Sequence, residues 1–400
     1  MVNWLQQLAQ RAQQKSVKVV GLMSGTSADA IDAALVQIDD SGDGRARLRV
    51  LHYAETPHRP KLRRRLMRAF EGNADPREIC LLNAQIGHAF GNAARRIVQD
   101  AGFSTDEMLA VGSHGQTLWH EPPHATLQIG CPAAVAVRSR LPVVDNFRAA
   151  DVALGGQGAP LAPYIDWTVF RSSSVSRALL NIGGIANIAF LPAGGEFSQT
   201  TAFDTGPGNA LMDAAAAFFT NGKRAYDNNG EQAAQGKPDS ELLQKWTRHP
   251  YCAAEPPKSS GREMFGAPYA RTLIEEGRRR QLSDNDLMAT LTAFTAETIA
   301  DAAKRHGPPD LRELIVSGGG ALNRTLMRML KTALEKRGVP LRFRQPDEWG
   351  VSAESKEAAL FALLARETLR GLTANAPRAT GAAQPAVLGS VTPPPTSRPA

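Results

Sequence analysis

The segment AFDTGPGNALMDA combines a carboxylate with a tight turn just before a predicted helix. Asp204 lies at the end of an apolar lead-in, a Gly-Pro-Gly bend follows it, and the helix is predicted to begin near Asn209. A carboxylate in this position can meet a polarised nucleophile and a phosphate together, because helix N-termini attract anions and carboxylates act as general bases. An ordinary helix cap with turn glycines is the alternative interpretation.

Two further segments have the composition of nucleotide-binding turns. GTSADAID, residues 25–32, offers a glycine turn, hydroxyl donors, and two carboxylates, Asp29 and Asp32, that can reach a magnesium ion or its waters. VSGGGALN, residues 316–323, offers three glycines on which a planar base could lie. A plain hairpin turn and a strained loop remain the respective alternatives. The sequence has neither G-x-x-x-x-G-K-[ST] nor a G-x-G-x-x-G after a strand, so any ATP site is predicted to be neither a P-loop nor a Rossmann pocket.

The segment SHGQTLWHEPPH contains three histidines, His114, His120 and His124, whose spacing could suggest a metal site. No acidic or cysteine ligand completes a set at zinc-like spacing. We interpret the segment instead as a polar loop that hydrogen-bonds the hydroxyls of a sugar. Residues 145–166 mix Arg148 with other polar residues and glycines, either as a second binding loop or as a crossing between domains.

The elements that must position these segments follow a repeated plan. Residues 17–38 and residues 177–192 each contain an apolar run, a turn of small residues and a second apolar run. Each is predicted to be a β-hairpin that opens a domain, so the chain is predicted to hold two copies of one α/β plan. Helix and strand signals after the second hairpin predict a helix from Ser283 to about His306, a strand over Leu311–Ser317, and helices over about 323–337 and 353–369.

Both ends of the chain are predicted to be dispensable for chemistry. Residues 1–16 look like a loosely attached helical extension with few apolar anchors. Residues 373–400 are rich in Ala, Pro, Gly, Ser and Thr and have no apolar period, which is typical of a low-complexity tail.

Composition limits the class of protein. With 42% hydrophobic and 21% charged residues, the 400-residue chain can form two domains, and no apolar run reaches the roughly 18 residues of a membrane span. The three cysteines lie far apart without a Cys-x-x-Cys pair, which favours a reducing, cytoplasmic setting. The formal charge of +7 is concentrated at residues 59–70, which we interpret as the wet face of an amphipathic helix and not as a nucleic-acid surface. A basic balance also suits anionic ligands.

Eight segments in order, from Gly21 to about Ala365, resemble the anhydro-N-acetylmuramic acid kinase family: GLMSGTSADAID, SHGQT, GGQGAPLAP, NIGGIANI, FDTGPGN, KSSGRE, SGGGALN and SKEAALFALLA. The resemblance implies an α/β fold of two duplicated actin-like, or ribonuclease H-like, domains that close over a central ATP cleft. It places domain I at 17–165, completed by a helix over 353–370, and domain II at 166–352. It also suggests a homodimer.

The reaction implied by the resemblance converts ATP, water and 1,6-anhydro-N-acetylmuramic acid into N-acetylmuramic acid 6-phosphate and ADP, in the recycling of bacterial cell-wall fragments. By similarity, Asp204 activates water for attack at the anomeric carbon, Glu357 helps to place that water, and the released O6 attacks the γ-phosphate. Mg²⁺ would neutralise charge on the phosphates. A conventional sugar kinase acting on a free hydroxyl and a non-catalytic, nucleotide-gated sensor are the alternatives.

The resemblance also implies the binding residues, with no protein residue assigned as a metal ligand. On the sugar side we expect His114, Gln116, Arg148, Lys258 and Arg262. Ala30 and Asn146 stand where the family usually has glycine and aspartate. The residues expected to bind the nucleotide are Gly25, Thr26, Ser27, Ala28, Asp29, Ala30, Ile31, Asp32, Gly206, Gly208, Asn209, Gly318, Gly319, Gly320 and Asn323.

Overall fold

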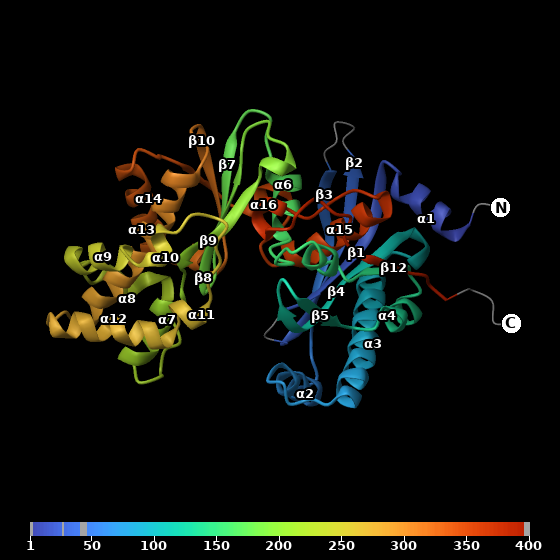
Figure 1. Cartoon of the computed structure of the whole chain (residues 1–400), viewed down its shortest axis with the longest axis horizontal. Coiled ribbons are helices and arrows are strands. Elements are labelled where there is room, and N and C mark those ends of the chain that lie inside the picture. The colour runs from blue at the N-terminus through green and yellow to red at the C-terminus, as the bar shows by residue number, and fades with distance from the viewer. Residues whose placement is uncertain (1–2, 26–27, 41–45, 396–400) are drawn as a thin grey trace. The chain divides into compact units, whose positions relative to one another are not determined.

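The computed structural model describes residues 3–25, 28–40 and 46–395 (Figure 1). The chain divides into two compact units, the first formed by Met1–Val169 with Trp349–Ala400 and the second by Phe170–Glu348. The C-terminal part of the chain therefore returns to the first unit. No helix within the described ranges is long and apolar enough to cross a membrane.

The first unit is built on a mixed sheet with the order β12-β6-β4-β1-β2-β3, and β5 pairs with β4. β1, β2 and β3 are antiparallel neighbours, whereas β4 runs parallel to both β1 and β6. The apolar run of β1 is buried almost throughout, as expected for a central strand covered on both faces. The strands are β1 (Ser16–Ser24), β2 (Ala30–Asp40), β3 (Ala46–Pro57), β4 (Met108–Glu121), β5 (Ala125–Ile129), β6 (Val143–Asp145) and β12 (Ser390–Thr392).

Helix α15 (Lys356–Arg370) packs on this sheet where the strands carry glycine. A Cβ at Gly21 of β1 would lie 1.8 Å from the carbonyl oxygen of Ala358, and one at Gly112 of β4 would lie 1.9 Å from that of Phe361. Only glycine permits so close an approach of strand and helix backbones. The other helices of this unit are α1 (Trp4–Ala12), α2 (Pro60–Phe70), α3 (Pro76–Asp100), η1 (Thr105–Glu107), α4 (Pro132–Ser139), α5 (Ala149–Ala153), α6 (Ala162–Phe170) and α16 (Pro377–Thr380).

The second unit contains the sheet β9-β8-β7-β10-β11, in which β7, β8 and β9 are antiparallel neighbours and β10 is parallel to β7 and β11. The path β3-β2-β1-β4-β6 of the first unit has the same directions in the same sequence. The predicted duplication of one α/β plan is therefore confirmed, and each copy opens with one of the two predicted hairpins. The strands are β7 (Ser176–Ile182), β8 (Ile185–Leu191), β9 (Thr201–Pro207), β10 (Leu311–Ser317) and β11 (Arg342–Arg344).

The core of the second unit surrounds the long helix α13 (Asp284–His306), whose start is set by the predicted Ser283 cap accepting the backbone N–H of Asp286. Threonines are buried along this helix, and some of their hydroxyls bond to backbone carbonyls. The other helices are η2 (Phe197–Gln199), α7 (Ala210–Phe219), η3 (Asn228–Gly230), α8 (Glu231–Ala234), α9 (Ser240–Thr247), α10 (Pro250–Ala253), α11 (Arg262–Phe265), α12 (Ala267–Arg279), η4 (Gly319–Leu322), α14 (Arg324–Lys336) and η5 (Pro346–Trp349).

The C-terminal segment, residues 373–395, differs from the predicted low-complexity tail. It carries α16 and β12, and β12 pairs with β6. Asn375, Thr380 and Leu388 are each about 1% exposed. The segment packs through small and polar residues, so it needs no apolar period to be ordered.

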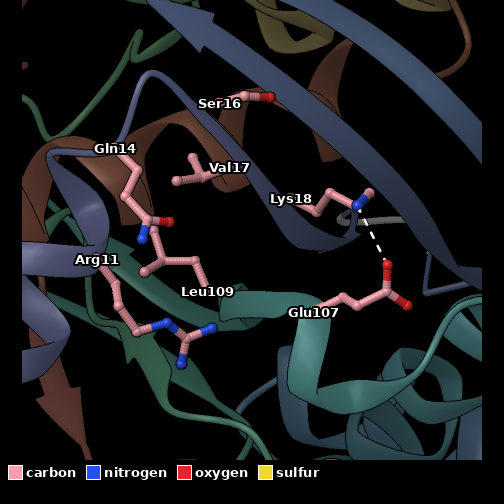
Figure 2. A pocket seen from close by; sticks show the side chains of 7 residues that line it. All are labelled: Arg11, Gln14, Ser16, Val17, Lys18, Glu107 and Leu109. Carbon is pink, nitrogen blue, oxygen red and sulfur yellow. Dashed lines mark hydrogen bonds and ion pairs between the residues drawn. The ribbon is translucent and has the colours of Figure 1, made fainter.

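The N-terminal helix α1 is also attached, because Leu8 and Ala12 are buried and Arg11 donates to the carbonyl oxygen of Met108 at 2.7 Å. Figure 2 shows a small polar pocket beside this helix, with the Lys18–Glu107 ion pair on one side. None of the predicted site residues lines this pocket. We interpret it as part of the seam between α1 and the strands.

Candidate active site

The predicted site residues fall into two sets, one in each unit. In the second unit, three glycine segments meet at the end of β7. The N–H groups of Gly208 and Asn209 donate to the carbonyl oxygens of Gly184 and Gly183 at 2.9 and 2.7 Å. A Cβ at Gly208 would lie 2.3 Å from the oxygen of Gly183, so only glycine fits. The N-terminus of α7 is thereby held against the β7–β8 turn by backbone hydrogen bonds.

The triple-glycine segment joins the same cluster. Gly318 has φ +83°, and a Cβ there would lie 2.7 Å from the carbonyl oxygen of Ile182. A Cβ at Gly320 would lie 2.3 Å from the side chain of Ile182, and the amide of Asn209 donates to the same residue's carbonyl at 3.3 Å. Gly319 is exposed beside Leu322, whose side chain is 75% exposed. This arrangement leaves a bare backbone surface next to an apolar side chain.

Two features of this cluster go beyond the sequence prediction. Gly183 and Gly184 were expected only as a hairpin turn, although their place in the repeated hairpin, matching the first phosphate-turn candidate, could have identified them. Asn323, which was expected at the nucleotide, also caps α14: its buried Oδ1 accepts the N–H of Leu326 at 2.9 Å. This oxygen therefore has a structural role at the start of the helix.

Asp204 lies on β9, half-buried and held by the 250–260 segment. Its Oδ2 accepts the backbone N–H of Ser260 at 2.8 Å, and its carbonyl oxygen accepts the hydroxyl of Tyr251 at 2.9 Å. Burial raises the pKa of Asp204, the Ser260 N–H opposes that rise, and the charge of Glu263 adds to it. The result is a carboxylate of raised basicity with one oxygen fixed by backbone.

The two cationic residues expected on the sugar side have different surroundings. The ammonium of Lys258 donates to the carbonyl oxygen of Tyr251 at 3.0 Å and lies 4.9 Å from the centre of that ring. Lys258 thus stabilises the conformation of the 250–260 segment, in which both residues lie. Arg262 lies at the glycine turn, since its Nε is 3.4 Å from where a Cβ of Gly184 would be. Burial raises the pKa of Asp213 on α7 to about 6, and the charge of Arg262 partly offsets that rise.

In the first unit, the turn between β1 and β2 is held by side chains. The amide of Gln116 donates to the carbonyl oxygen of Gly25 at 2.9 Å, and its oxygen lies 2.7 Å from the hydroxyl of Ser24. His58 lies 3.2 Å from the same hydroxyl. Gln116, expected to bind sugar, therefore supports the phosphate-turn candidate. Thr26 and Ser27 lie outside the described residues.

The rest of the first turn divides between core and surface. Ala28 and Ile31 are buried among the apolar residues of the unit, so the side chain of Ile31 belongs to the core. Asp29 is exposed and pairs with Arg63 at 2.7 Å. Asp32 accepts the hydroxyl of Tyr53 at 2.7 Å, and burial, followed by that bond, raises the pKa of Tyr53.

The two departures from the family pattern are both compatible with the backbone. Ala30 begins β2 and lies outside the left-handed region, so a side chain adds no backbone strain there. Asn146 has φ +58°, a conformation that Asn and Asp tolerate better than other residues with side chains.

His114, which is buried, and Arg148, which is half-buried, form a hydrogen-bonded pair. Arg148 Nε donates to Nε2 of His114 at 2.9 Å, and Nδ1 of His114 lies 2.9 Å from the carbonyl oxygen of Gly115. Nε2 must accept, so His114 is neutral with its proton on Nδ1. Burial, and then the charge of Arg148, hold its pKa well below the ordinary value. Its ring lies 4.7 Å from that of Phe361 on α15.

Glu357 is exposed in the first turn of α15, where the helix dipole favours a carboxylate. Burial lowers the pKa of Arg148 to about 10, while the charges of Glu357 and then Asp151 oppose that change. The structure therefore brings His114, Arg148 and Glu357 into one electrostatic group. Among the described residues, no set of three or more His, Cys, Asp or Glu side chains is arranged to hold a metal ion.

Comparison with known proteins gives a consistent family match. The family model described as anhydro-N-acetylmuramic acid kinase matches residues 17–394. The protein of that name from Salinibacter ruber is 42% identical over 392 residues, covering 94% of this chain and 96% of the relative. That of Bacillus cereus is 40% identical over 386 residues, covering 94% and 99%. Among solved structures, the activator of 2-hydroxyisocaproyl-CoA dehydratase from Clostridium difficile with bound ADPNP matches with a TM-score of 0.43 and 12% identity, covering 88% of this chain and 96% of that one.

Proposed function

Since the chain belongs to the anhydro-N-acetylmuramic acid kinase family, we propose that Asp204 is the general base in a ring-opening phosphoryl transfer. The enzyme is a phosphotransferase that uses ATP, and its reaction yields N-acetylmuramic acid 6-phosphate and ADP from the 1,6-anhydro sugar and water. Water attacks the anomeric carbon and gives its proton to Asp204. The bond from that carbon to O6 breaks, and O6 attacks the γ-phosphorus as ADP leaves.

The fixed orientation of the Asp204 carboxylate is the observation that carries this proposal. Ser260 holds Oδ2, which leaves Oδ1 as the oxygen that accepts the proton from water. The pKa of Asp204 is raised by burial, so the carboxylate is a stronger base than an exposed aspartate. The hydrogen bond from Ser260 favours the charged form of the carboxylate and opposes that rise.

The glycine turns are suited to phosphate because they expose backbone N–H groups without side chains. A Cβ at Gly25 would meet nothing within 4 Å, so this turn has open space for a ligand. Gly319 with Leu322 offers the surface for adenine. Mg²⁺ would neutralise phosphate charge, held mostly by phosphate oxygens and water, since Asp29 and Asp32 already have protein partners.

The His114–Arg148 pair and Glu357 are proposed to act on the sugar side. Arg148 has one face engaged by His114 and keeps its positive charge, which suits the lactyl carboxylate or a sugar oxygen. Glu357 would help to place the attacking water. A cytoplasmic location, expected from the cysteine usage, and a homodimer, expected from the resemblance, complete the proposal.

A coupled ADP-release assay with purified protein tests this function. We expect ADP release with 1,6-anhydro-N-acetylmuramic acid and none above background with plain N-acetylmuramic acid. In ¹⁸O-labelled water, the label should appear at the anomeric hydroxyl of the product. Equal ADP release with both sugars would instead indicate a conventional sugar kinase, and no release with either would favour a sensor.

The role of Asp204 is tested by Asp204→Asn. Removing a general base should lower kcat by roughly 10²- to 10⁴-fold. The folded-state pKa of Asp204 is raised, so its charge destabilises the fold above that pKa, and the neutral variant should melt no lower than wild type at pH 7. Asp310→Asn, at an exposed carboxylate bonded to Ser176, is the matched control and should keep full activity. Full turnover by Asp204→Asn would refute the assignment.

A further inference from the structure

Asp151 is a fully buried carboxylate that the proposed reaction does not use. Its exposed fraction is 0%, and its oxygens accept three hydrogen bonds. Oδ2 accepts the backbone N–H of Gly158 at 2.7 Å, and Oδ1 accepts the amide of Asn375 and the hydroxyl of Thr380, each at 2.8 Å. Two of the three donors therefore come from the C-terminal segment, more than 220 residues later in the chain.

The C-terminal segment holds the surrounding loop at further points. The N–H of Gln157 donates to the carbonyl oxygen of Thr380 at 2.8 Å, and the N–H of Ala383 donates to that of Leu154 at 2.9 Å. β12 pairs with β6, which ends three residues before Arg148. The stretch that contains Arg148 is thus held on both sides by the segment.

Gly158 connects this cluster to Arg148. Its N–H binds Asp151, and its carbonyl oxygen accepts Nη1 of Arg148 at 2.7 Å. Gly158 has φ +64°, and a Cβ there would lie 2.8 Å from the side chain of Val152. The backbone of Gly158 therefore links Asp151 to the guanidinium of Arg148, through its N–H on one side and its carbonyl oxygen on the other.

We propose that Asp151 is a positioning residue for Arg148 and that the C-terminal segment is the element that fixes it, which rests on the sugar-side role proposed for Arg148. Arginine has a long side chain with several rotatable bonds, so an unsupported guanidinium would sample many positions. The bonds to Gly158 and His114 leave it a narrow range. The segment expected to be dispensable thereby sets the affinity for the anhydro sugar.

The test compares Thr380→Val with Thr168→Val. The first replaces the hydroxyl that binds Asp151, whereas the hydroxyl of Thr168, which is also buried in the first unit, donates within its own helix to the carbonyl oxygen of Tyr164 at 2.7 Å. Loss of the bond to Asp151, together with the longer one that the hydroxyl accepts from the N–H of Ala382 at 3.4 Å, should raise KM for the anhydro sugar roughly fivefold to tenfold in Thr380→Val. KM for ATP should change less than about twofold. Thr380→Ser, which retains the hydroxyl, should restore the wild-type KM.

Hydrogen exchange at the amides of Gln157 and Gly158, measured on the free protein, gives a readout independent of turnover. We expect faster exchange in Thr380→Val and wild-type exchange in Thr168→Val and Thr380→Ser. Equal increases in both KM values, or unchanged exchange, would overturn the proposal. If the wild type released no ADP with the anhydro sugar, the proposed function would fail, while the exchange data would still decide whether Asp151 positions the loop.

Discussion

The two hairpin turns that open the two sheets are held in opposite ways. The β7–β8 turn of the second unit is held by backbone, with the carbonyls of Gly183 and Gly184 accepting from the start of α7. The β1–β2 turn of the first unit is held by side chains, chiefly those of Ser24 and Gln116. One duplicated plan has therefore produced two different turns. The second-unit turn packs so closely on Gly208 that a Cβ there would lie 2.3 Å from the oxygen of Gly183, whereas the geometry of the first-unit turn depends on particular side chains.

The carboxylates of Asp204 and Asp32 show the same contrast between a backbone donor and a side-chain donor. Asp204 is oriented by a backbone N–H from the 250–260 segment, whereas Asp32 accepts a side-chain hydroxyl from Tyr53. Backbone donors are fixed by the fold and cannot be lost by substitution of a side chain. This difference is consistent with placing the reacting carboxylate in the second unit and phosphate binding in the first.

The largest effect should come from a glycine-to-alanine substitution where Gly208 packs against the β7–β8 turn, compared with the same substitution in the β1–β2 turn. Gly208→Ala puts a methyl group 2.3 Å from the carbonyl oxygen of Gly183, so the backbone around Asp204 must move. Overpacking of this kind destabilises by about 1–3 kcal/mol. A displacement of about 1 Å near the reacting groups can lower kcat by roughly 100-fold.

Gly25→Ala is the matched control for stability, because its Cβ meets nothing within 4 Å and its φ is not in the left-handed region. Its melting temperature should equal that of wild type. Melting curves and ADP release measured on both variants decide the point. If Gly25→Ala were the less stable of the two, the contrast between the close packing at Gly208 and the open space at Gly25 would be wrong.

A smaller effect is expected from the side chain that holds the first turn. Gln116→Leu removes both the amide that donates to Gly25 and the oxygen that accepts the hydroxyl of Ser24, and loss of these hydrogen bonds should raise KM for ATP roughly twofold to tenfold. The sugar KM should stay close to wild type, because Gln116 contacts the turn. Gln128→Leu on β5, whose side-chain amide donates to the hydroxyl of Thr126 at 2.7 Å, is the control and should leave both KM values unchanged. A rise in the sugar KM alone would indicate that Gln116 binds the sugar, as expected from the sequence.

Local sequence patterns predicted the parts of the molecule that depend on local chemistry. The repeated hairpins gave the duplicated plan, and Ser283 and Asn323 mark helix starts because capping is decided within three residues. Glycines followed by a helix indicated the Gly208 turn for the same reason.

The remaining features depend on contacts between distant segments. Gln116 meets Ser24 only because β4 lies parallel to β1 with these residues in register, 92 positions apart. The bond from Ser260 to Asp204 and those from the C-terminal segment to Asp151 likewise join separate stretches. Small polar residues such as Thr380 carry no hydrophobic period, so no local pattern marks their burial.

The smallest effect concerns the pKa of Asp204, because the N–H of Ser260 is not the only group that shifts it. Burial raises its pKa first, and the charge of Glu263 adds to that rise. Glu263→Gln should therefore lower the pKa, so that the base stays deprotonated to lower pH and the acid limb of the kcat profile moves to lower pH. Because Glu263 is exposed, the shift should shrink in 1 M salt, where the screening length is about 3 Å.

Glu275→Gln makes the same charge change at an exposed position on α12 and should leave the acid limb in place. A limb that moved equally in both variants would reflect net charge instead of a local interaction with Asp204. An acid limb that moved in neither would mean that a group other than Asp204 controls it. In that case Asp204 would no longer differ from Asp32 in its role, because the pH dependence of kcat would not follow the ionisation of Asp204.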